Sequence, residues 1–377
     1  MEHEDISLNA QSKARLVRRI KRWLQRHGIS RSARNEAINP KESRRFVTGL
    51  YLGVLRRRPS DEEVNQHIDA LRVGITPVSL LEQFLDSEEF KRLALTEFFV
   101  PPGHFYSPIV DRTEAEAQFA RITSEGIPES VPGITIDRNE MRQTWQKLVQ
   151  LMVAAPFAEL PANGLMYGFN NPYYGWGDGS VLYGMVRHYR PNRVIEVGSG
   201  WSSACMVDTV ETSTALKCEF TFIEPYPSPL LRELVARDLR FSRVRLIDHP
   251  VQCVPHTTFS ELQSGDILFI DSSHILKTGS DVCYELFDIL PRLSKGVLVH
   301  FHDMFWPFEY PEPWVMDENR SWNELYAVRA FLTNNHDWRV VLFNDFLRHF
   351  ERPLIEATYP AFYRSPGGAL WIERTDN

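Results

Sequence analysis

Residues 193–203 read Arg-Val-Ile-Glu-Val-Gly-Ser-Gly-Trp-Ser-Ser. A short β-branched run that contains an acid and then breaks into two glycines is typical of a buried parallel strand that turns sharply into a helix. Gly198 and Gly200 allow the backbone to approach a ligand closely, and the following helix begins with free N–H groups. Glu196 adds a carboxylate at the strand tip. We therefore expect a pocket for a ligand that carries both negative and positive groups.

Strand and helix patterns alternate on the C-terminal side of this stretch. The apolar runs predict strands at 193–197, 219–224, 243–248, 266–271 and 296–301, with helices and short connections between them. Two further apolar runs, 338–343 and 369–372, end the pattern without a clear helix between them. Such alternation predicts an α/β fold with a parallel, doubly wound sheet.

Acidic residues and histidines recur where the predicted strands end. Because ligands of such sheets bind at the carboxyl ends of the strands, we read these tips together. Glu224, at the second tip, is placed to accept hydrogen bonds from ribose hydroxyls. Asp248 and His249 follow the third strand, and Asp271 follows the fourth. The fifth ends in Val-His-Phe-His-Asp, residues 299–303. In a purely structural sheet these acids would repel one another.

The glycine stretch resembles the first motif of class I methyltransferases, an acid-x-Gly-x-Gly pattern matched by Glu196, Gly198 and Gly200. The resemblance implies S-adenosylmethionine as cofactor, Asp248-His249 at its adenine edge, and a Rossmann-like sheet that is mostly parallel with an antiparallel last strand. It also implies that the aromatic, glycine-rich stretch 164–183 helps to cover the cofactor. Tyr167, Asn171 and Asp178 are the candidate cofactor residues there. Segment 344–368 is expected to line the acceptor site.

The fourth and fifth tips also resemble those of macrocin-type, magnesium-dependent sugar O-methyltransferases, which read Asp-x-x-His and then acid-Asp. Adjacent strands lie about 4.8 Å apart, so carboxylates at their tips can share one divalent cation. We predict a metal site at Asp271, His302 and Asp303, with Asp271 and His274 as catalytic residues and His274 as the presumed base. Because His302 replaces an acid of the family, Mn or another transition metal suits the site better than Mg.

Three alternatives stay open at this point. His300 and His302 point to the same face of one strand and, with Asp271 or Asp303, could form the facial triad of a non-haem iron oxygenase. The Gly-x-Gly pattern is shared with NAD-dependent and nucleotide-sugar enzymes, although a third glycine is missing. Finally, the domain could be a non-catalytic methyltransferase-like scaffold in glycan assembly.

The N-terminal third differs in composition. Residues 11–35 hold nine Lys or Arg and no acid, with apolar residues on one helical face, which predicts a basic amphipathic helix for an anionic membrane surface or for the protein itself. Residues 41–100 resemble a small helical module of unknown function from bacterial, often glycan-related, proteins; Ser60 and Glu63 predict a capping box there. We divide the chain into a tail (1–40), a helical module (41–100), a linker and lid helix (101–160) and a methyltransferase domain (161–377).

Composition limits the functional classes. The 377 residues are 43% hydrophobic with a formal net charge of −7, which argues against a general nucleic-acid binder. An acidic N-terminus and the lack of long apolar runs predict a cytoplasmic protein, peripheral at the inner membrane surface at most. The four cysteines form no metal or disulfide pattern. The expected partner is a small-molecule or glycan acceptor, and a homo-oligomer stays open.

Overall fold

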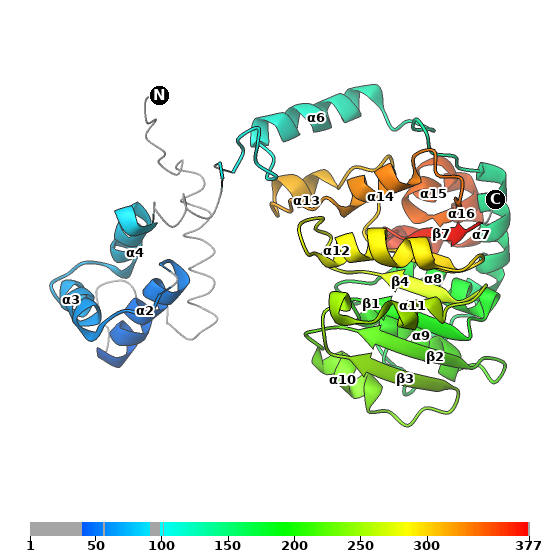
Figure 1. Cartoon of the computed structure of the whole chain (residues 1–377), viewed down its shortest axis with the longest axis horizontal. Helices are drawn as coiled ribbons and strands as arrows, with labels where there is room; N and C mark the ends of the chain where they lie inside the picture. Colours follow the sequence, from blue (N-terminus) through cyan, green and yellow to red (C-terminus); the bar gives the residue numbers. More distant parts are fainter. Residues whose placement is uncertain (1–39, 56, 91–98, 101, 376–377) are drawn as a thin grey trace. The chain divides into compact units, whose positions relative to one another are not determined.

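A computed structural model of the chain describes residues 40–55, 57–90, 99–100 and 102–375 (Figure 1). The chain divides into two compact units, Met1–Asp111 and Arg112–Asn377, which we describe separately. The predicted basic helix at 11–35 lies outside the described residues. In the described part of the chain, no helix is long and apolar enough to cross a membrane.

The first unit is helical. Among its described residues, the helices are α2 (Pro40–Gly53), α3 (Asp61–Arg72) and α4 (Pro77–Asp86). The predicted capping box is confirmed, because the Ser60 side chain accepts a hydrogen bond from the Glu63 backbone and the Glu63 side chain accepts one from the Ser60 backbone. Apolar side chains from all three helices form a separate core that includes Phe46, Leu80 and Phe84. This unit therefore has the means to fold around its own core.

The second unit contains a seven-stranded sheet in the order β3-β2-β1-β4-β5-β7-β6. The strands are β1 (Arg193–Val197), β2 (Cys218–Ile223), β3 (Ser242–Ile247), β4 (Ile267–Ile270), β5 (Leu298–Phe301), β6 (Trp338–Phe343) and β7 (Leu370–Arg374). The pairs among β1 to β5 are parallel, whereas β7 runs antiparallel to both β5 and β6. The predicted fold class, a mostly parallel, doubly wound sheet with an antiparallel last strand, is confirmed.

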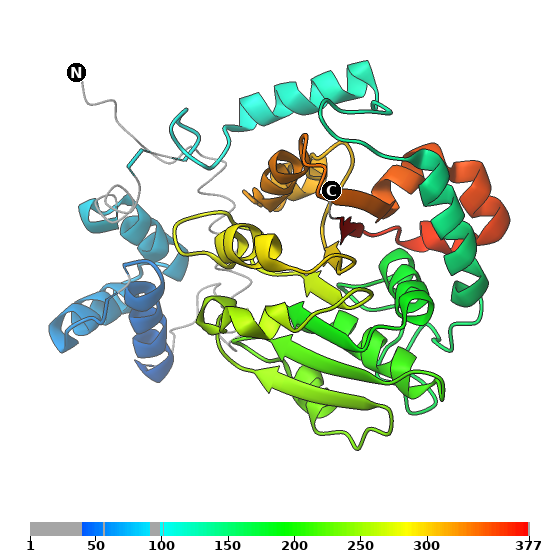
Figure 2. The same ribbon diagram turned by 45° about the vertical axis from the view of Figure 1, so that its right-hand side comes forward.

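Helices of the second unit flank this sheet (Figure 2). They are α6 (Arg112–Glu125), α7 (Arg138–Met152), α8 (Trp176–Tyr189), α9 (Trp201–Glu211), α10 (Pro229–Val235), α11 (His256–Ser260), α12 (Asp281–Tyr284), α13 (Glu312–Met316), α14 (Glu324–Leu332), α15 (Asn344–Phe350) and α16 (Arg352–Thr358). A π-helical turn, Glu285–Ile289, extends α12. From β1 the chain adds β2 and then β3 toward one edge of the sheet, whereas after β4 it adds β5 toward the other edge. Because the crossovers between parallel strands are right-handed, α9 and α10 cover one face and α12 the other.

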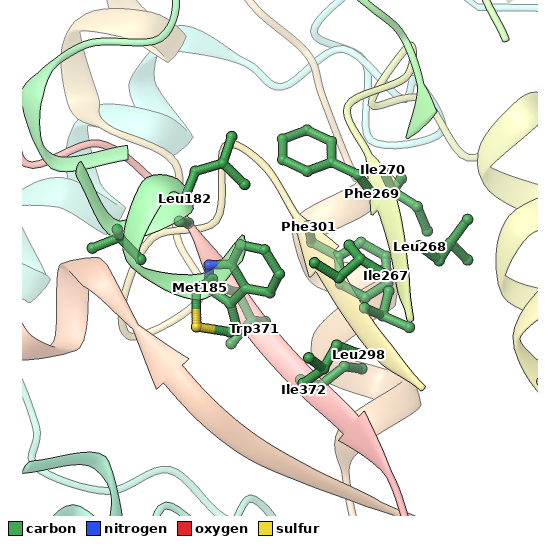
Figure 3. Close-up of a cluster of buried hydrophobic side chains, with 14 of the residues drawn as sticks. Leu182, Met185, Ile267, Leu268, Phe269, Ile270, Leu298, Phe301, Trp371 and Ile372 are labelled. Atoms are coloured by element: carbon green, nitrogen blue, oxygen red, sulfur yellow. The ribbon is translucent and has the colours of Figure 1, made fainter. Parts of the chain in front are cut away.

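The centre of the sheet is apolar on both faces, as expected for parallel strands covered by helices. All four residues of β4 are buried, and so are all four of β5. Figure 3 shows Leu182 and Met185 of α8 beside residues of β4, β5 and β7. Each fully buried side chain of this size contributes about 1.5–3 kcal/mol of transfer free energy. The result is a rigid platform whose strand ends carry the polar residues.

Two segments differ from the prediction. Helix α6 occupies part of the predicted linker, where Ala115 and Phe119 pack against Met316. So few apolar positions leave a weak helical pattern in the sequence. Between β6 and β7 the expected irregular segment 344–368 forms α15, α16 and a 3-10 turn at Pro360–Arg364. These helices are seven residues long, too short to be recognised from periodicity, and depend on tertiary packing.

A helix expected within 101–160 is present as α7, whose first turn is capped by the Asp137 side chain. Trp145 and Leu148 are fully buried, and α7 packs against α8. This helix is therefore part of the core of the second unit.

Asp208 of α9 is a buried anchor for the segment that precedes α8. Its carboxylate accepts backbone hydrogen bonds from Met166 (2.6 Å) and Tyr167 (2.8 Å) and pairs with Arg237 at 2.7 Å. We expect Asp208→Ala to lower the free energy of unfolding by about 3–5 kcal/mol, because two backbone N–H groups and a half-buried guanidinium lose their buried partner.

Glu356→Ala is the matched control for chemical denaturation, since it removes a carboxylate from the exposed Arg352–Glu356 pair. We expect that change to cost less than about 1 kcal/mol. Equal effects of the two substitutions would contradict the anchoring role of Asp208.

Candidate functional site

A cavity of about 800 Å³ opens at the carboxyl ends of the central strands. The loops after β1, β2, β4 and β5 line it, together with the segment before α8 and the region between α13 and α14. From these elements come Gly198–Ser202, Glu224, Ser228–Leu230, Asp271–His274, His302 and Asp303, Pro172–Tyr174, and Trp314, Arg320 and Trp322. The cavity lies where the crossovers change direction between β1 and β4, as expected for a ligand site in such a sheet.

The two glycines of the loop after β1 have different roles. Gly198 has a φ of +80°, and a Cβ atom there would lie 1.7 Å from the carbonyl oxygen of Asp271. Only glycine fits this close approach of two loops. A Cβ on Gly200 would meet no atom within 4 Å. Gly200 therefore leaves room in front of the first turn of α9, where a ligand can approach the backbone N–H groups.

Glu196 does not line the cavity. It is fully buried and accepts hydrogen bonds from the hydroxyls of Ser202, at 2.5 Å, and Ser203. Burial raises the pKa of this carboxyl to about 8, although the two serine hydroxyls work in the opposite direction. The structure thus places Glu196 behind the glycine loop, where it holds the start of α9.

The cofactor residues predicted at the second and third strand tips differ in their position relative to the cavity. Glu224 lines the cavity, is half-buried and accepts the backbone N–H of Tyr226 at 2.8 Å. Asp248 and His249 are exposed, with side chains about 70% accessible, and do not line the cavity. β3 is the edge strand, so its end is the farthest of the parallel strands from the centre of the site.

Tyr167 and Asn171 shape the loop that borders the cavity. The Tyr167 hydroxyl is buried and donates to the carbonyl of Tyr174 at 2.7 Å. The Asn171 amide donates to the same carbonyl at 2.7 Å, and its oxygen accepts the backbone N–H of Tyr173 and of Tyr174. Both residues act on the backbone, while Tyr173 and Tyr174 reach the cavity. Asp178 is buried in α8, outside the lining, with Oδ2 3.3 Å from Nε2 of His302.

Two carboxylates and two imidazoles meet at the ends of β4 and β5. Nε2 of His274 lies 3.4 Å from Asp271 Oδ1 and 3.6 Å from Asp303 Oδ2. Nδ1 of His302 lies 3.3 Å from Asp271 Oδ1 and 3.7 Å from Asp303 Oδ1. One ligand atom each of Asp271, His274 and Asp303 lies within 4.8 Å of the others, so His274 joins the carboxylates as closely as a metal ligand would. The prediction placed His302, not His274, in this set.

The backbone of this cluster is unusual. His274 has a φ of +60° and Asp303 a φ of +58°. Residues other than glycine rarely adopt this left-handed backbone conformation, which costs on the order of 1 kcal/mol or more per residue. Such residues persist when surrounding contacts hold them, and they concentrate at functional sites.

Glu324 is a residue that could not be selected from the sequence. Its carboxylate, from the first turn of α14, accepts from Nδ1 of His274 at 2.7 Å, and both side chains are buried. Backbone N–H groups of Asn323 and Glu324 donate to the carbonyl of His274, and the Trp322 ring packs against its imidazole at 4.3 Å. α14 therefore fixes both the backbone and the ring of His274. His274 and Glu324 are 50 residues apart in the sequence, so no local sequence pattern predicts their pairing.

Charges within the cluster influence one another. Burial opposes the charged form of Asp271, but the imidazoles of His302 and His274 prevail and lower the pKa of this carboxyl. Burial likewise opposes a charged His274, yet hydrogen bonds to Asp271 and Glu324 raise its pKa to about 10. Positive charge on the imidazoles is thus favoured between these carboxylates.

His300 does not take part. Burial lowers the pKa of its imidazole well below the ordinary range, and neither ring nitrogen has a hydrogen-bond partner. The ring stacks on Phe269 at 4.0 Å and lies outside the cavity lining. A facial triad with two histidines of β5 is therefore contradicted, because only His302 faces the carboxylates.

A cationic and aromatic wall closes one side of the cavity. The Arg320 guanidinium lies 4.0 Å from the ring centre of Trp314 and 4.5 Å from that of Trp322, and it pairs with Glu318. Residues 344–368, predicted to line the acceptor site, contribute nothing to this lining; that prediction is wrong. The segment forms helices that pack at the end of the sheet instead.

Glu196 provides a test of site electrostatics through pH. Its carboxyl has a pKa of about 8 in the folded protein against 4.5 for an ordinary glutamate. The folded state therefore holds this proton more tightly, so the associated stability is complete below pH 4.5 and is lost as pH rises through about 8. Glu196→Gln has no proton to lose. We expect its unfolding free energy, relative to wild type, to rise by about 2–4 kcal/mol across that range.

Denaturant titrations at several pH values between those limits measure this difference. Glu356→Gln, at an exposed helical position, serves as the control and should give a flat difference. Parallel curves for Glu196→Gln and wild type would show that Glu196 is ionised in the folded protein at neutral pH.

Comparison with known proteins identifies the domain. Residues 195–304 match a family model described as a methyltransferase domain, and residues 29–94 match DUF4214, a domain of unknown function. An uncharacterized protein of Archaeoglobus fulgidus is 33% identical over 169 residues, which cover 44% of this chain and 75% of that protein.

Solved structures with a similar fold include two methyltransferases. The SAH-bound methyltransferase PaMTH1 of Podospora anserina is 17% identical with a TM-score of 0.34, and the match covers 70% of this chain and 97% of that one. The O-methyltransferase TomG of Streptomyces achromogenes, in complex with SAM, is 13% identical with a TM-score of 0.35, covering 64% and 92%. From the family model and the archaeal relative, this chain carries a methyltransferase domain and belongs to the same family as the Archaeoglobus fulgidus protein.

Proposed function

We propose that the protein is an S-adenosylmethionine-dependent O-methyltransferase that methylates a hydroxyl of a sugar or glycan with the help of a divalent metal ion. One observation carries the proposal. A single cavity brings the glycine loop and Glu224 together with the Asp271, His274 and Asp303 cluster. A cofactor site and a group that can hold and deprotonate an acceptor are thus adjacent.

The residues present fit the cofactor. Gly200 leaves open space in front of α9, whose N-terminal N–H groups suit a carboxylate, and Glu224 offers an acceptor for ribose hydroxyls at the same rim. S-adenosylmethionine supplies an electrophilic methyl group when it is bound. Glu196 supports the loop from behind, and the Asn171-held turn presents Tyr173 and Tyr174 to the cavity.

The residues also fit a divalent metal ion. Asp271 and Asp303 bring two carboxylates together at adjacent strand tips, and His302 adds a nitrogen atom at 3.3 Å from Asp271. Two like charges at this separation favour a cation between them. A metal ion at this site would neutralise both acids and polarise the acceptor hydroxyl.

His274 is the proposed proton acceptor. Glu324 binds Nδ1 of its ring, so Nε2 faces the space beside Asp271 and Asp303, into which the acceptor hydroxyl would enter. A carboxylate behind the imidazole stabilises the cation that forms when the proton arrives. A cation between Asp271 and Asp303 would replace the positive charge of the ring there and lower its pKa, so that His274 could act as an oriented general base.

A sugar or glycan acceptor is proposed because the tips resemble those of macrocin-type enzymes, and the cavity wall supports it. Trp314, Trp322 and Tyr173 provide flat apolar surfaces, while the carboxylates and Arg320 provide hydrogen-bonding groups. A ring that carries both C–H and O–H groups matches this mixture.

The role of Glu224 can be measured by calorimetry with S-adenosylmethionine. Because its carboxylate would lose hydrogen bonds to a bound ribose, we expect Glu224→Ala to weaken binding by about 1.5–3 kcal/mol. Asp248→Ala is the matched control, since this acid ends the neighbouring strand but is exposed outside the cavity, and its affinity should match that of wild type. A folded Glu224 variant with unchanged affinity would remove the residue from the cofactor site.

The role of His274 is tested by release of S-adenosylhomocysteine in the presence of candidate sugar acceptors. We expect His274→Ala to slow transfer by about 10²–10⁴-fold while cofactor and metal affinity stay close to wild type. Asp303→Ala should abolish metal-dependent transfer with the cofactor still bound. Glu285→Gln changes a buried carboxyl that does not line the cavity, and it should transfer normally.

Two results would count against this mechanism. Full transfer in excess EDTA would exclude a metal requirement. Loss of metal affinity in His274→Ala would make His274 a ligand, as its place in the cluster also allows, and another group would then have to take the proton.

A further inference from the structure

His300 of β5 and His302, which directly follows this strand, have contrasting environments, although the centres of their rings lie only 6.0 Å apart. His300 is fully buried without any hydrogen-bond partner, between Phe269 and Trp371. His302 is also buried, yet both of its ring nitrogens face carboxylates. The example of His300 shows that an imidazole can be buried here without a carboxylate beside it. Burial alone therefore does not explain why an acid lies next to Nε2 of His302.

That acid is Asp178, and the structure holds it firmly. Its Oδ1 accepts from the Asn344 amide at 3.1 Å, and its side chain is only 3% exposed. A Cβ on Gly367 would lie 1.9 Å from Oδ2, and one on Gly177 would lie 2.2 Å from the carbonyl oxygen of Pro366. The first turn of α8 is thus pressed against this segment, and both glycines are needed for the contact. The carboxylate has almost no room to turn away from His302.

The two ring nitrogens of His302 point to different groups. Nε2 lies 3.3 Å from Asp178 Oδ2, on the side away from the cavity. Nδ1 lies 3.3 Å from Asp271 and 3.7 Å from Asp303, on the side of the carboxylate pair. If Nε2 donates its hydrogen to Asp178, the lone pair of Nδ1 is left for the carboxylate pair and for any cation that it binds.

We infer that Asp178 is a positioning residue that fixes the tautomer and orientation of His302, so that His302 completes a binding site for a divalent transition metal with Asp271 and Asp303. This inference rests on the proposed metal role of that cluster. Asp178 does not touch the ion; it acts through His302.

A nitrogen ligand has consequences for metal choice. Magnesium prefers an all-oxygen environment, whereas an imidazole beside two carboxylates suits Mn, Fe, Co or Zn. The carboxylate behind the imidazole raises the basicity of the ligand nitrogen, and loss of such a partner typically costs about 10–100-fold in metal affinity. Asp178 should therefore matter for cobalt and much less for magnesium.

The experiment titrates the full-length, metal-free protein with Co²⁺ and with Mg²⁺ by calorimetry, and records the visible spectrum of the cobalt form. We expect Asp178→Asn to weaken Co²⁺ binding by about 10–100-fold, with a smaller change for Mg²⁺ and an altered cobalt spectrum. His302→Gln should reproduce the loss. The double variant should bind no more weakly than His302→Gln alone, because Asp178 acts only through this ring.

Glu285→Gln is the control for a change of a buried carboxyl near the site. Burial raises the pKa of Glu285 well above its usual range, which favours the neutral acid that Gln resembles, and this carboxyl accepts a hydrogen bond from the Ser272 hydroxyl. Its Co²⁺ affinity should equal that of wild type. Far-ultraviolet circular dichroism and calorimetry with S-adenosylmethionine verify that each variant is folded.

The outcomes separate the inference from the proposed function. Wild-type protein that binds neither ion would overturn the proposed metal role and this inference together. Wild-type binding of Co²⁺ that Asp178→Asn leaves unchanged would overturn the inference alone. If Asp178→Asn does not fold, Asn344→Ser tests the same point, because it removes the amide that holds Asp178; unchanged Co²⁺ affinity and spectrum there would also overturn the inference.

Discussion

The approach of Asp271 and Asp303 is the constraint on which the rest of the site depends. Two carboxylates at adjacent strand tips repel each other unless positive charge or a proton lies between them. In this protein two imidazoles supply that charge, and they outweigh burial enough to lower the pKa of Asp271. Each imidazole is held in turn by another buried carboxylate, Glu324 behind His274 and Asp178 behind His302. The cluster is therefore an alternation of acids and histidines.

The fold brings this cluster next to the glycine loop through a single close contact. Gly198 approaches the carbonyl of Asp271 so closely that no side chain fits between them. The loop after β1 and the loop after β4 are neighbours because β1 pairs with β4 at the point where the strand order reverses. A cofactor at the first loop and an acceptor at the second would thus lie on either side of one backbone contact, and a rigid apolar sheet below keeps their spacing constant.

The helical unit at 40–90 is stabilised by a small apolar core and by ion pairs between its helices. Arg57 pairs with Glu63 and Glu89, lies 4.8 Å from the ring centre of Tyr51, and joins the ends of two helices around a small core. These charged groups are engaged with one another and leave no convergent titratable cluster in the described part of this unit.

Much of the catalytic unit could be predicted from the sequence, because hydrophobic periodicity and turn residues are local signals. They place five parallel strands within a residue or two, and the acids at their tips follow directly. Local signals could not say which acids turn toward the cavity. Glu196 and Glu224 both lie at strand tips, yet Glu196 is buried behind the loop and Glu224 lines the site.

The sequence by itself thus determined the sheet, the glycine loop and the presence of Asp271, His274, His302 and Asp303 near one edge. Only the tertiary structure decided what stands behind each histidine. Asp178 is 124 residues from His302, and Glu324 is 50 residues from His274. Such partners are chosen by the packing of α8 and α14 against the strand ends, and side-chain packing between distant segments leaves no periodic trace in the chain.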